Sequence, residues 1–340
     1  MKYFFLLFLY ACTSAPYYSG PITEHFNGDT FENRLPQTKG FFTYLLMRLS
    51  TKQDPWPDWV ESKPQKIPER FLKDGVISAT FINHSTFFLN INGIKLLTDP
   101  IFSRRASPFS WIGPKRVITP GVAFDDLPSI DLILLSHNHY DHLDIDSLKK
   151  LYQRDKPLII TGLGNSLLLK QHGIDNVKEM DWNQKVEFKD LLIRFVYCQH
   201  WSGRGLFDRR KTLWGSFIVE SPESKIYFAG DTGYSSHFKE QGDRYGPFDL
   251  SLIPIGSYKP RSFMGFTHLD PEQAVLAHLD LRSKKTIGMH FGTFQLSNES
   301  RQAPIDDLKK ARMKYNVKEN VFFPPSFGTT YMIKNLKKDD

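Results

Sequence analysis

The segment LSHNHYDHLD, Leu135–Asp144, restricts the fold of this chain more than any other. The chain has 11 histidines in 340 residues, yet three of them stand within six positions here, with an aspartate among them. They directly follow the apolar run DLILLS, whose composition predicts a buried strand. A loop after a strand lets neighbouring side chains converge on one point, which helical spacing would not do for this set. The four candidate ligands are His137, His139, Asp141 and His142.

Imidazole and carboxylate groups are the ligands that Zn²⁺ and similar divalent metals prefer in proteins. Four of them within six residues exceed the needs of one open site, so the pattern predicts two metals. The alternative is a solvated, histidine-rich loop, which would have no reason to follow an apolar strand.

Three further apolar runs end on a residue that can bind a metal. IRFVYCQH ends at His200, IYFAGD at Asp231 and KKTIGMH at His290. A single histidine at a strand end is more often structural. Three such ends, added to the H-x-H-x-D-H segment, favour one site with seven ligands and no cysteine.

The rest of the chain predicts a layered α/β protein. Hydrophobic residues make up 40% and aromatic residues 14%, which is typical of packed globular proteins. From Gly75 on, short β-rich apolar runs alternate with helical stretches at 142–154, 270–281 and 303–316, which predicts one or two central sheets. We treat 75–340 as one catalytic domain and 12–74, rich in proline and aromatic residues, as an arm wrapped over it.

The N-terminal sequence MKYFFLLFLYAC predicts a signal peptide over residues 1–11, of the lipoprotein type, with Cys12 as the acylated first residue. Its apolar run is far shorter than the ~20 residues that span a bilayer. An ordinary signal peptide and a hydrophobic segment packed on the protein remain alternatives.

The net charge of +7 fits an anionic substrate, nucleic acid or an anionic lipid surface. The basic residues are spread along the chain rather than gathered in a stripe, so no nucleic-acid partner is expected. With only two cysteines, the chain has no disulfide framework.

Between residues 79 and 294 the chain carries, in order, LTDPIFSRRASP, GPKR, SHNHYDHLD, LWGSF, FAGDTGY, GPFDLSLIPIGSYKPR, DPEQAV and MHFGTF. This series resembles the metallo-β-lactamase superfamily. Within it, the series is similar to the N-acylphosphatidylethanolamine-hydrolysing phospholipase D family and its bacterial relatives, some of them outer-membrane lipoproteins. The resemblance implies an α/β metallo-β-lactamase fold, a four-layer αββα sandwich. It also implies two zinc ions per chain, one held by His137, His139 and His200, the other by Asp141, His142 and His290, with Asp231 bridging them.

The implied activity is that of a zinc-dependent phosphodiesterase of the phospholipase D type. It would hydrolyse N-acylphosphatidylethanolamine or a related phospholipid by attack of a metal-bridging hydroxide on phosphorus. Asp141 is the candidate for orienting the nucleophile and passing a proton to the leaving group. His268, in FTHLDPEQA, matches a position near the catalytic centre, where it would contact phosphate or donate a proton. The alternative for His268 is helix capping, for which Asp270 is the better residue.

Two residues are candidates for supporting the ligands by hydrogen bonds, Asp99 in LLTDP and His84 in INHSTFF. Asp99 could instead make an Asp-Pro turn, and His84 could lie on the floor of the pocket. After His200, the arginines Arg204, Arg209 and Arg210 could receive an anionic head group or belong to a solvated loop.

Two other functions would use the same sequence features. A hydrolase of lactones or nucleotide phosphodiesters would keep the site and change the substrate. A non-catalytic envelope lipoprotein would use the metal for structure alone, but structural zinc sites are usually closed and rich in cysteine. The expected partners are a phosphodiester substrate and a membrane surface reached through the lipid anchor. The expected location is the bacterial cell envelope, at the outer membrane, and the resemblance alone implies a homodimer.

Overall fold

The computed structural model describes residues 16–36, 51–68 and 76–334. The predicted signal peptide, residues 1–11, and Cys12 lie outside the described residues.

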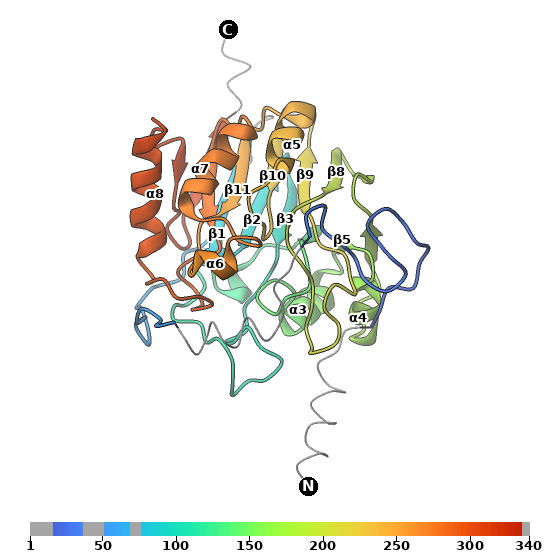
Figure 1. Ribbon diagram of the computed structural model, residues 1–340. Coiled ribbons are helices and arrows are strands. Elements are labelled where there is room, and N and C mark those ends of the chain that lie inside the picture. The colour runs from blue at the N-terminus through green and yellow to red at the C-terminus, as the bar shows by residue number, and fades with distance from the viewer. Residues whose placement is uncertain (1–15, 37–50, 69–75, 335–340) are drawn as a thin grey trace.

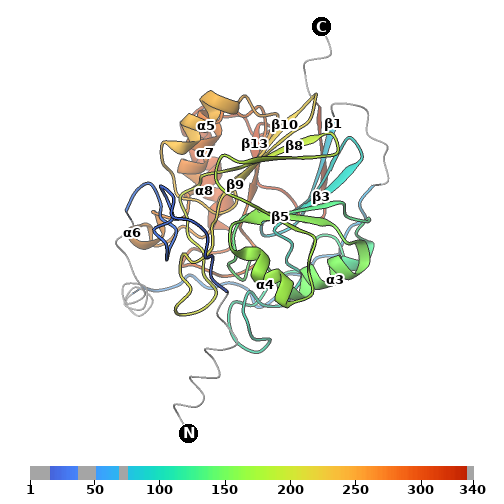
Figure 2. The same ribbon diagram turned by 90° about the vertical axis from the view of Figure 1, so that its right-hand side faces the viewer.

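In this part of the chain, two seven-stranded sheets lie face to face (Figure 2). The first sheet has the order β14 (Thr330–Lys334), β1 (Val76–Asn83), β2 (Thr86–Ile91), β3 (Ile94–Thr98), β4 (Leu132–Leu135), β5 (Leu158–Gly162) and β6 (Val177–Met180). The second has the order β13 (Phe322–Phe323), β12 (Thr286–Met289), β11 (Leu250–Pro254), β10 (Lys225–Phe228), β9 (Ser216–Glu220), β8 (Leu191–Val196) and β7 (Lys185–Phe188).

Helices cover the outer face of each sheet (Figures 1 and 2). The first sheet carries α3 (Ile145–Asp155) and α4 (Asn165–Gln171), and the second carries α5 (His237–Tyr245), α7 (Pro271–Asp280) and α8 (Ala303–Lys314). The short α6 (Arg261–Met264) precedes α7, and a 3₁₀ turn, η1, spans Phe124–Asp126. The four-layer αββα sandwich is therefore confirmed, and each of the three predicted helical stretches contains a helix.

The alternation of side chains along β4 explains why its sequence is apolar at every position. Leu132 and Leu134 pack into the core between the sheets. Ile133 and Leu135 point the other way and pack with Leu148 of α3 in a second core. A strand that is buried on both faces needs a continuous hydrophobic run, whereas a half-exposed strand would alternate with polar residues.

Each sheet combines an antiparallel half with a parallel half. In the first sheet, β3, β4, β5 and β6 are parallel neighbours, and in the second, β10, β11, β12 and β13 are. Parallel strands end at the same edge, so the loops after β3, β4, β10 and β12 meet at one end of the sandwich.

The described parts of the arm lie against the body. The phenyl rings of Phe26 and Phe31 are buried in the core between the sheets, and the backbone NH of Val60 donates to the carbonyl of Val117. Among the described residues, none of the helices combines the length and the apolar character that a bilayer crossing requires.

Close approach of the two sheets after β4 and β10 depends on Gly230. This glycine has φ +58°, and a Cβ at its position would lie 2.6 Å from Cβ of Ser136. Both the backbone conformation and the contact exclude a side chain.

We expect Gly230→Ala to lower the free energy of unfolding by about 3 kcal/mol, from backbone strain and steric overlap together. Gly93→Ala is the matched control, because Gly93 also has a positive φ of +86° but has no atom within 4 Å of the added Cβ. The control should lose only about 1 kcal/mol. Urea unfolding of both variants measures the difference, and equal losses would contradict the packing argument.

Candidate metal centre

All seven predicted ligands come together at the end of the sandwich where the parallel strands finish. Each one follows a strand: His137, His139, Asp141 and His142 follow β4, His200 follows β8, Asp231 follows β10 and His290 follows β12. Their side chains form overlapping groups in which the ligand atoms lie within 4.8 Å of one another, and two of these groups correspond to the two predicted metal sites.

The first group consists of three histidines, His137, His139 and His200. Nδ1 of His139 lies 2.8 Å from Nε2 of His137 and 3.3 Å from Nε2 of His200. Three imidazole nitrogens facing one point are what a divalent metal site with an open position needs.

The second group consists of Asp141, His142 and His290, with Asp231 between the two groups. Oδ2 of Asp141 is 3.3 Å from Nε2 of both His142 and His290. Oδ2 of Asp231 is 3.2 Å from Nε2 of His142, 3.0 Å from Nε2 of His290 and 3.8 Å from Nε2 of His200. The Asp231 carboxylate therefore faces both groups.

The donor atoms fit a metal better than they fit one another. Nε2 of His142 and Oδ1 of Asp231 are buried and have no hydrogen-bond partner in the described chain. Buried polar atoms without partners are costly, and a coordinated cation would satisfy both of these. The residues present therefore suit the metal that the fold implies.

The histidines of the two groups differ in charge. Burial, with help from the neighbouring imidazoles, lowers the pKa of His139 and of His200 to about 3 and holds the pKa of His137 well below its usual range. Burial also opposes the charge of His290, but Asp231 and Asp141 outweigh it and raise the pKa of His290 to about 9. The carboxylates likewise raise the pKa of His142 well above its usual value.

Hydrogen bonds fix the orientation of several ligands. Asp99 lies directly after β3, and its carboxylate accepts from the backbone NH and the hydroxyl of Ser136, at 2.8 and 2.6 Å, and from Nδ1 of His142 at 2.6 Å. The carbonyl oxygen of Thr267 accepts from Nδ1 of His200 at 2.9 Å. Asp99 therefore lies within hydrogen-bond reach of the ligand His142, and its supporting role stays a prediction.

His84 and His268, the other two candidates, also lie at the site. Nε2 of His84 is 2.9 Å from Oδ2 of Asp141, and the ring packs 4.0 Å from that of His290. Nδ1 of His268 is buried, has no hydrogen-bond partner in the described chain, and lies 3.8 Å from Oδ2 of Asp231. The N-terminus of α7 is capped by Asp270, whose carboxylate accepts from the backbone NH of Gln273. The roles of His84 and His268 stay predictions.

Arg204, one of the arginines that follow His200, is half-buried. Its guanidinium lies over the ring of Tyr140 and donates to the carbonyls of Asn138 and Leu143, both at 2.8 Å. Asp144 was overlooked in the sequence, although it accepts from the backbone and hydroxyl of Ser103. It lies within the helical stretch predicted at 142–154, where nothing in the sequence indicated this contact.

Acidification should release metal from the second group before the first. Binding there must displace a proton from His290 below pH 9, whereas His139 and His200 stay neutral down to about pH 3. Each displaced proton weakens Zn²⁺ binding about a hundredfold between pH 8 and pH 6, and His142, whose pKa is also raised, adds to the loss. Titration of the metal-free chain with Zn²⁺ at both pH values measures this, and parallel weakening of every binding step would contradict it.

Known proteins place this centre in a family. The model of the beta-lactamase superfamily domain matches residues 95–291. An uncharacterised protein of Mycobacterium tuberculosis is 39% identical over 240 residues, which are 69% of this chain and 64% of that protein. The chain thus spans less than two thirds of that relative. An N-acyl-phosphatidylethanolamine-hydrolyzing phospholipase D of Caenorhabditis elegans is 37% identical over 252 residues, 71% of each chain.

Among solved structures, a metallo hydrolase from the archaeon Ignicoccus hospitalis has the same fold. It superposes with a TM-score of 0.59 at 21% identity, and the match covers 76% of this chain and 99% of the archaeal chain. The family match, the histidine and aspartate groups and this fold lead to one conclusion. The chain belongs to the beta-lactamase superfamily.

Proposed function

We propose that this chain is a metal-dependent hydrolase, a zinc-dependent phosphodiesterase of the phospholipase D type that acts on N-acylphosphatidylethanolamine or a related phospholipid. The observation that carries the proposal is the position of Asp231, whose Oδ2 lies within 3.8 Å of ligand nitrogens from both groups. Two zinc ions held on either side of this carboxylate would supply the attacking hydroxide and neutralise charge on the phosphate oxygens.

Asp141 is suited to orienting the nucleophile. Within the described chain, all contacts of its carboxylate with histidines use Oδ2, which leaves Oδ1 to accept a hydrogen bond from water. Burial would raise its pKa, but His142 and its other histidine neighbours hold the pKa well below the usual range. The carboxylate is therefore ionised at neutral pH, which favours orientation of the water over storage of a proton.

His268 is suited to contacting the phosphate. Burial lowers its pKa to about 3, so the imidazole is neutral at physiological pH. The backbone around it is fixed, because Arg261 donates to the carbonyl of His268 and forms an ion pair with Asp270. A neutral imidazole with an unpartnered buried nitrogen can donate a hydrogen bond to a phosphate oxygen beside Asp231.

The lipid substrate has support beyond the 37% identity to the Caenorhabditis elegans enzyme. Trp111 and Ile112 are 65% and 51% exposed, and Leu206 is 68% exposed. Trp111 and Ile112 lie on one loop, and Leu206 lies on another. Arg105 shapes the loop of Trp111 and Ile112 by donating to the carbonyls of Ser110 and Gly113, which stand on either side of these two residues.

The two loops that carry these side chains flank the metal-binding segment. Ser103 bonds Asp144 on one side, and Arg204 bonds Leu143 on the other. Both loops project from the same end of the molecule (Figures 1 and 2). Exposed apolar side chains among arginines and lysines are typical of surfaces that dock on anionic membranes. In our proposal, a lipid on Cys12 would hold the enzyme at the envelope membrane, and a homodimer stays a prediction.

The full chain, loaded with Zn²⁺, should release phosphatidic acid from N-acylphosphatidylethanolamine in mixed micelles. Asp231→Ala should abolish the release because both ligand groups lose their common carboxylate. His268→Gln should lower kcat about a hundredfold, the usual contribution of one proton-transfer or phosphate contact. Asp243→Ala is the control, because this exposed carboxylate on α5 pairs only with Lys239 among the described residues.

A chromogenic phosphodiester and a lactone would be assayed in parallel. Bound metal with turnover of the lactone alone would contradict the phosphodiesterase proposal. Turnover of the chromogenic diester without the phospholipid would contradict only the lipid substrate.

Replacing Trp111 and Ile112 together by serine should weaken binding to vesicles containing anionic phospholipid at least about tenfold. Hydrolysis of the water-soluble diester should not change, because neither side chain contacts a ligand. Vesicle sedimentation measures the binding, and the control exchanges Leu279, 44% exposed on α7, for serine. An equal loss in both variants would contradict docking through these loops.

A further inference from the structure

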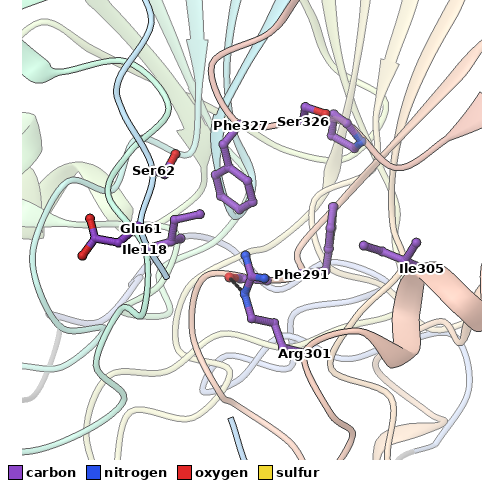
Figure 3. Close-up of a pocket in the computed structure, with 10 residues that line it drawn as sticks. Glu61, Ser62, Ile118, Phe291, Arg301, Ile305, Ser326 and Phe327 are labelled. Atoms are coloured by element: carbon purple, nitrogen blue, oxygen red, sulfur yellow. Dashed lines mark hydrogen bonds between the residues drawn. The ribbon is translucent and has the colours of Figure 1, made fainter. Parts of the chain in front are cut away.

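A second cavity lies beside the metal centre, at the side where the arm meets α8 (Figure 3). Its volume is about 350 Å³, within the range of pockets that hold small organic ligands. The side chains that matter for its chemistry are Arg301, Phe291, Phe327, Ile118, Ile305 and Ser326.

The charge of Arg301 is not balanced in this cavity. Its Nε donates to the carbonyl of Gly292 at 2.9 Å, and no carboxylate of the described chain lies within 4 Å of the guanidinium. Glu61 is on the rim, but its carboxylate points away from the arginine (Figure 3). Burial lowers the pKa of Arg301, yet a guanidinium keeps its proton in a protein. A fork of N–H donors is thus presented to the cavity without an anion.

The opposite walls of the cavity are apolar and rigid. Phe327 packs 4.9 Å from Phe81, and Phe291 stacks on the same ring at 5.8 Å. Backbone hydrogen bonds close the arm side, from Val60 to Val117 and from Gln65 to Gly121. A ligand therefore meets a formed cavity and need not order its walls on binding.

We propose that this cavity binds a small amphipathic carboxylate, with the acid on Arg301 and an apolar body against Phe291, Phe327 and Ile118. A carboxylate matches the fork of the guanidinium, which can bond both oxygens. Inorganic phosphate would satisfy the charge but would leave the aromatic walls unused. A neutral apolar molecule would fill the walls but would leave the half-buried charge of Arg301 unpaired.

The cavity also borders the metal centre through the backbone. Phe291 and Gly292 directly follow the ligand His290, whose NH donates to the carbonyl of His84. A bound acid would add contacts to Phe291 and to Arg301, which itself holds Gly292. Binding should therefore raise the melting temperature of the zinc-loaded protein, because the ligand binds only the folded chain.

The acid could have an aliphatic or an aromatic body, so the test uses both. Calorimetric titration of the zinc-loaded full chain with octanoate and with phenylacetate should give saturable binding of one acid per chain. Octanol and 2-phenylethanol, which have the same bodies without the charge, should bind at least about tenfold more weakly. Whichever of the two acids binds more tightly shows whether the cavity prefers an aliphatic or an aromatic body.

Arg301→Gln should weaken binding of the acid at least about tenfold, whereas Lys309→Gln, an exposed charge on α8, should leave it unchanged. Ile305→Trp should abolish binding by filling the cavity, and it keeps the test valid if Arg301→Gln folds poorly. Absence of saturable binding, equal affinity for the alcohols, or binding that survives both variants, as it would at the metal centre, would overturn the proposal.

Discussion

The metal centre depends on the electrostatics of three buried carboxylates, those of Asp99, Asp141 and Asp231. In the described chain their only cationic partners within 4 Å are histidines, since neither lysine nor arginine reaches them. Buried carboxylates without a permanent positive charge are costly. Protons on His142 and His290 compensate the charge when metal is absent, and a divalent cation would compensate it more fully. The need for positive charge, more than the number of histidines, makes this end of the sandwich a metal site.

Both the two-sheet fold and the gathering of the seven candidate ligands were accessible from the sequence, for one physical reason. Parallel strands buried on both faces give continuous apolar runs, and their ends must meet at one edge. A residue that can bind a metal at the end of such a run is therefore expected at the edge where the strands meet. His200, Asp231 and His290 are such residues. The strands β6 and β7 were not predicted, because VKEM and KVEF are short, charged and partly exposed at the sheet edges.

The supporting contacts were less accessible, because they join segments far apart in the sequence. Arg204 in a loop rich in arginine gave no sign that its guanidinium bonds Asn138 and Leu143. Thr267 supports His200 through its backbone carbonyl. Every residue type has such a carbonyl, so the sequence could not indicate this contact. Asp99 and His84 were candidates only by residue type, in LLTDP and INHSTFF. Sequence patterns therefore indicate groups that bind metal more readily than the groups that orient them.

The outer parts of the chain carry what distinguishes this protein from others with the same fold. The solved structure at 21% identity shares the fold over 76% of this chain, so the sandwich also forms from a sequence that differs at most positions. The family model ends at residue 291, and Arg301, Ile305 and Phe327 of the second cavity lie beyond it. Phe291 and Gly292, which directly follow His290, join the metal centre to the second cavity. A change of ligand in the cavity can therefore arise in the flanking segments without altering a single metal ligand.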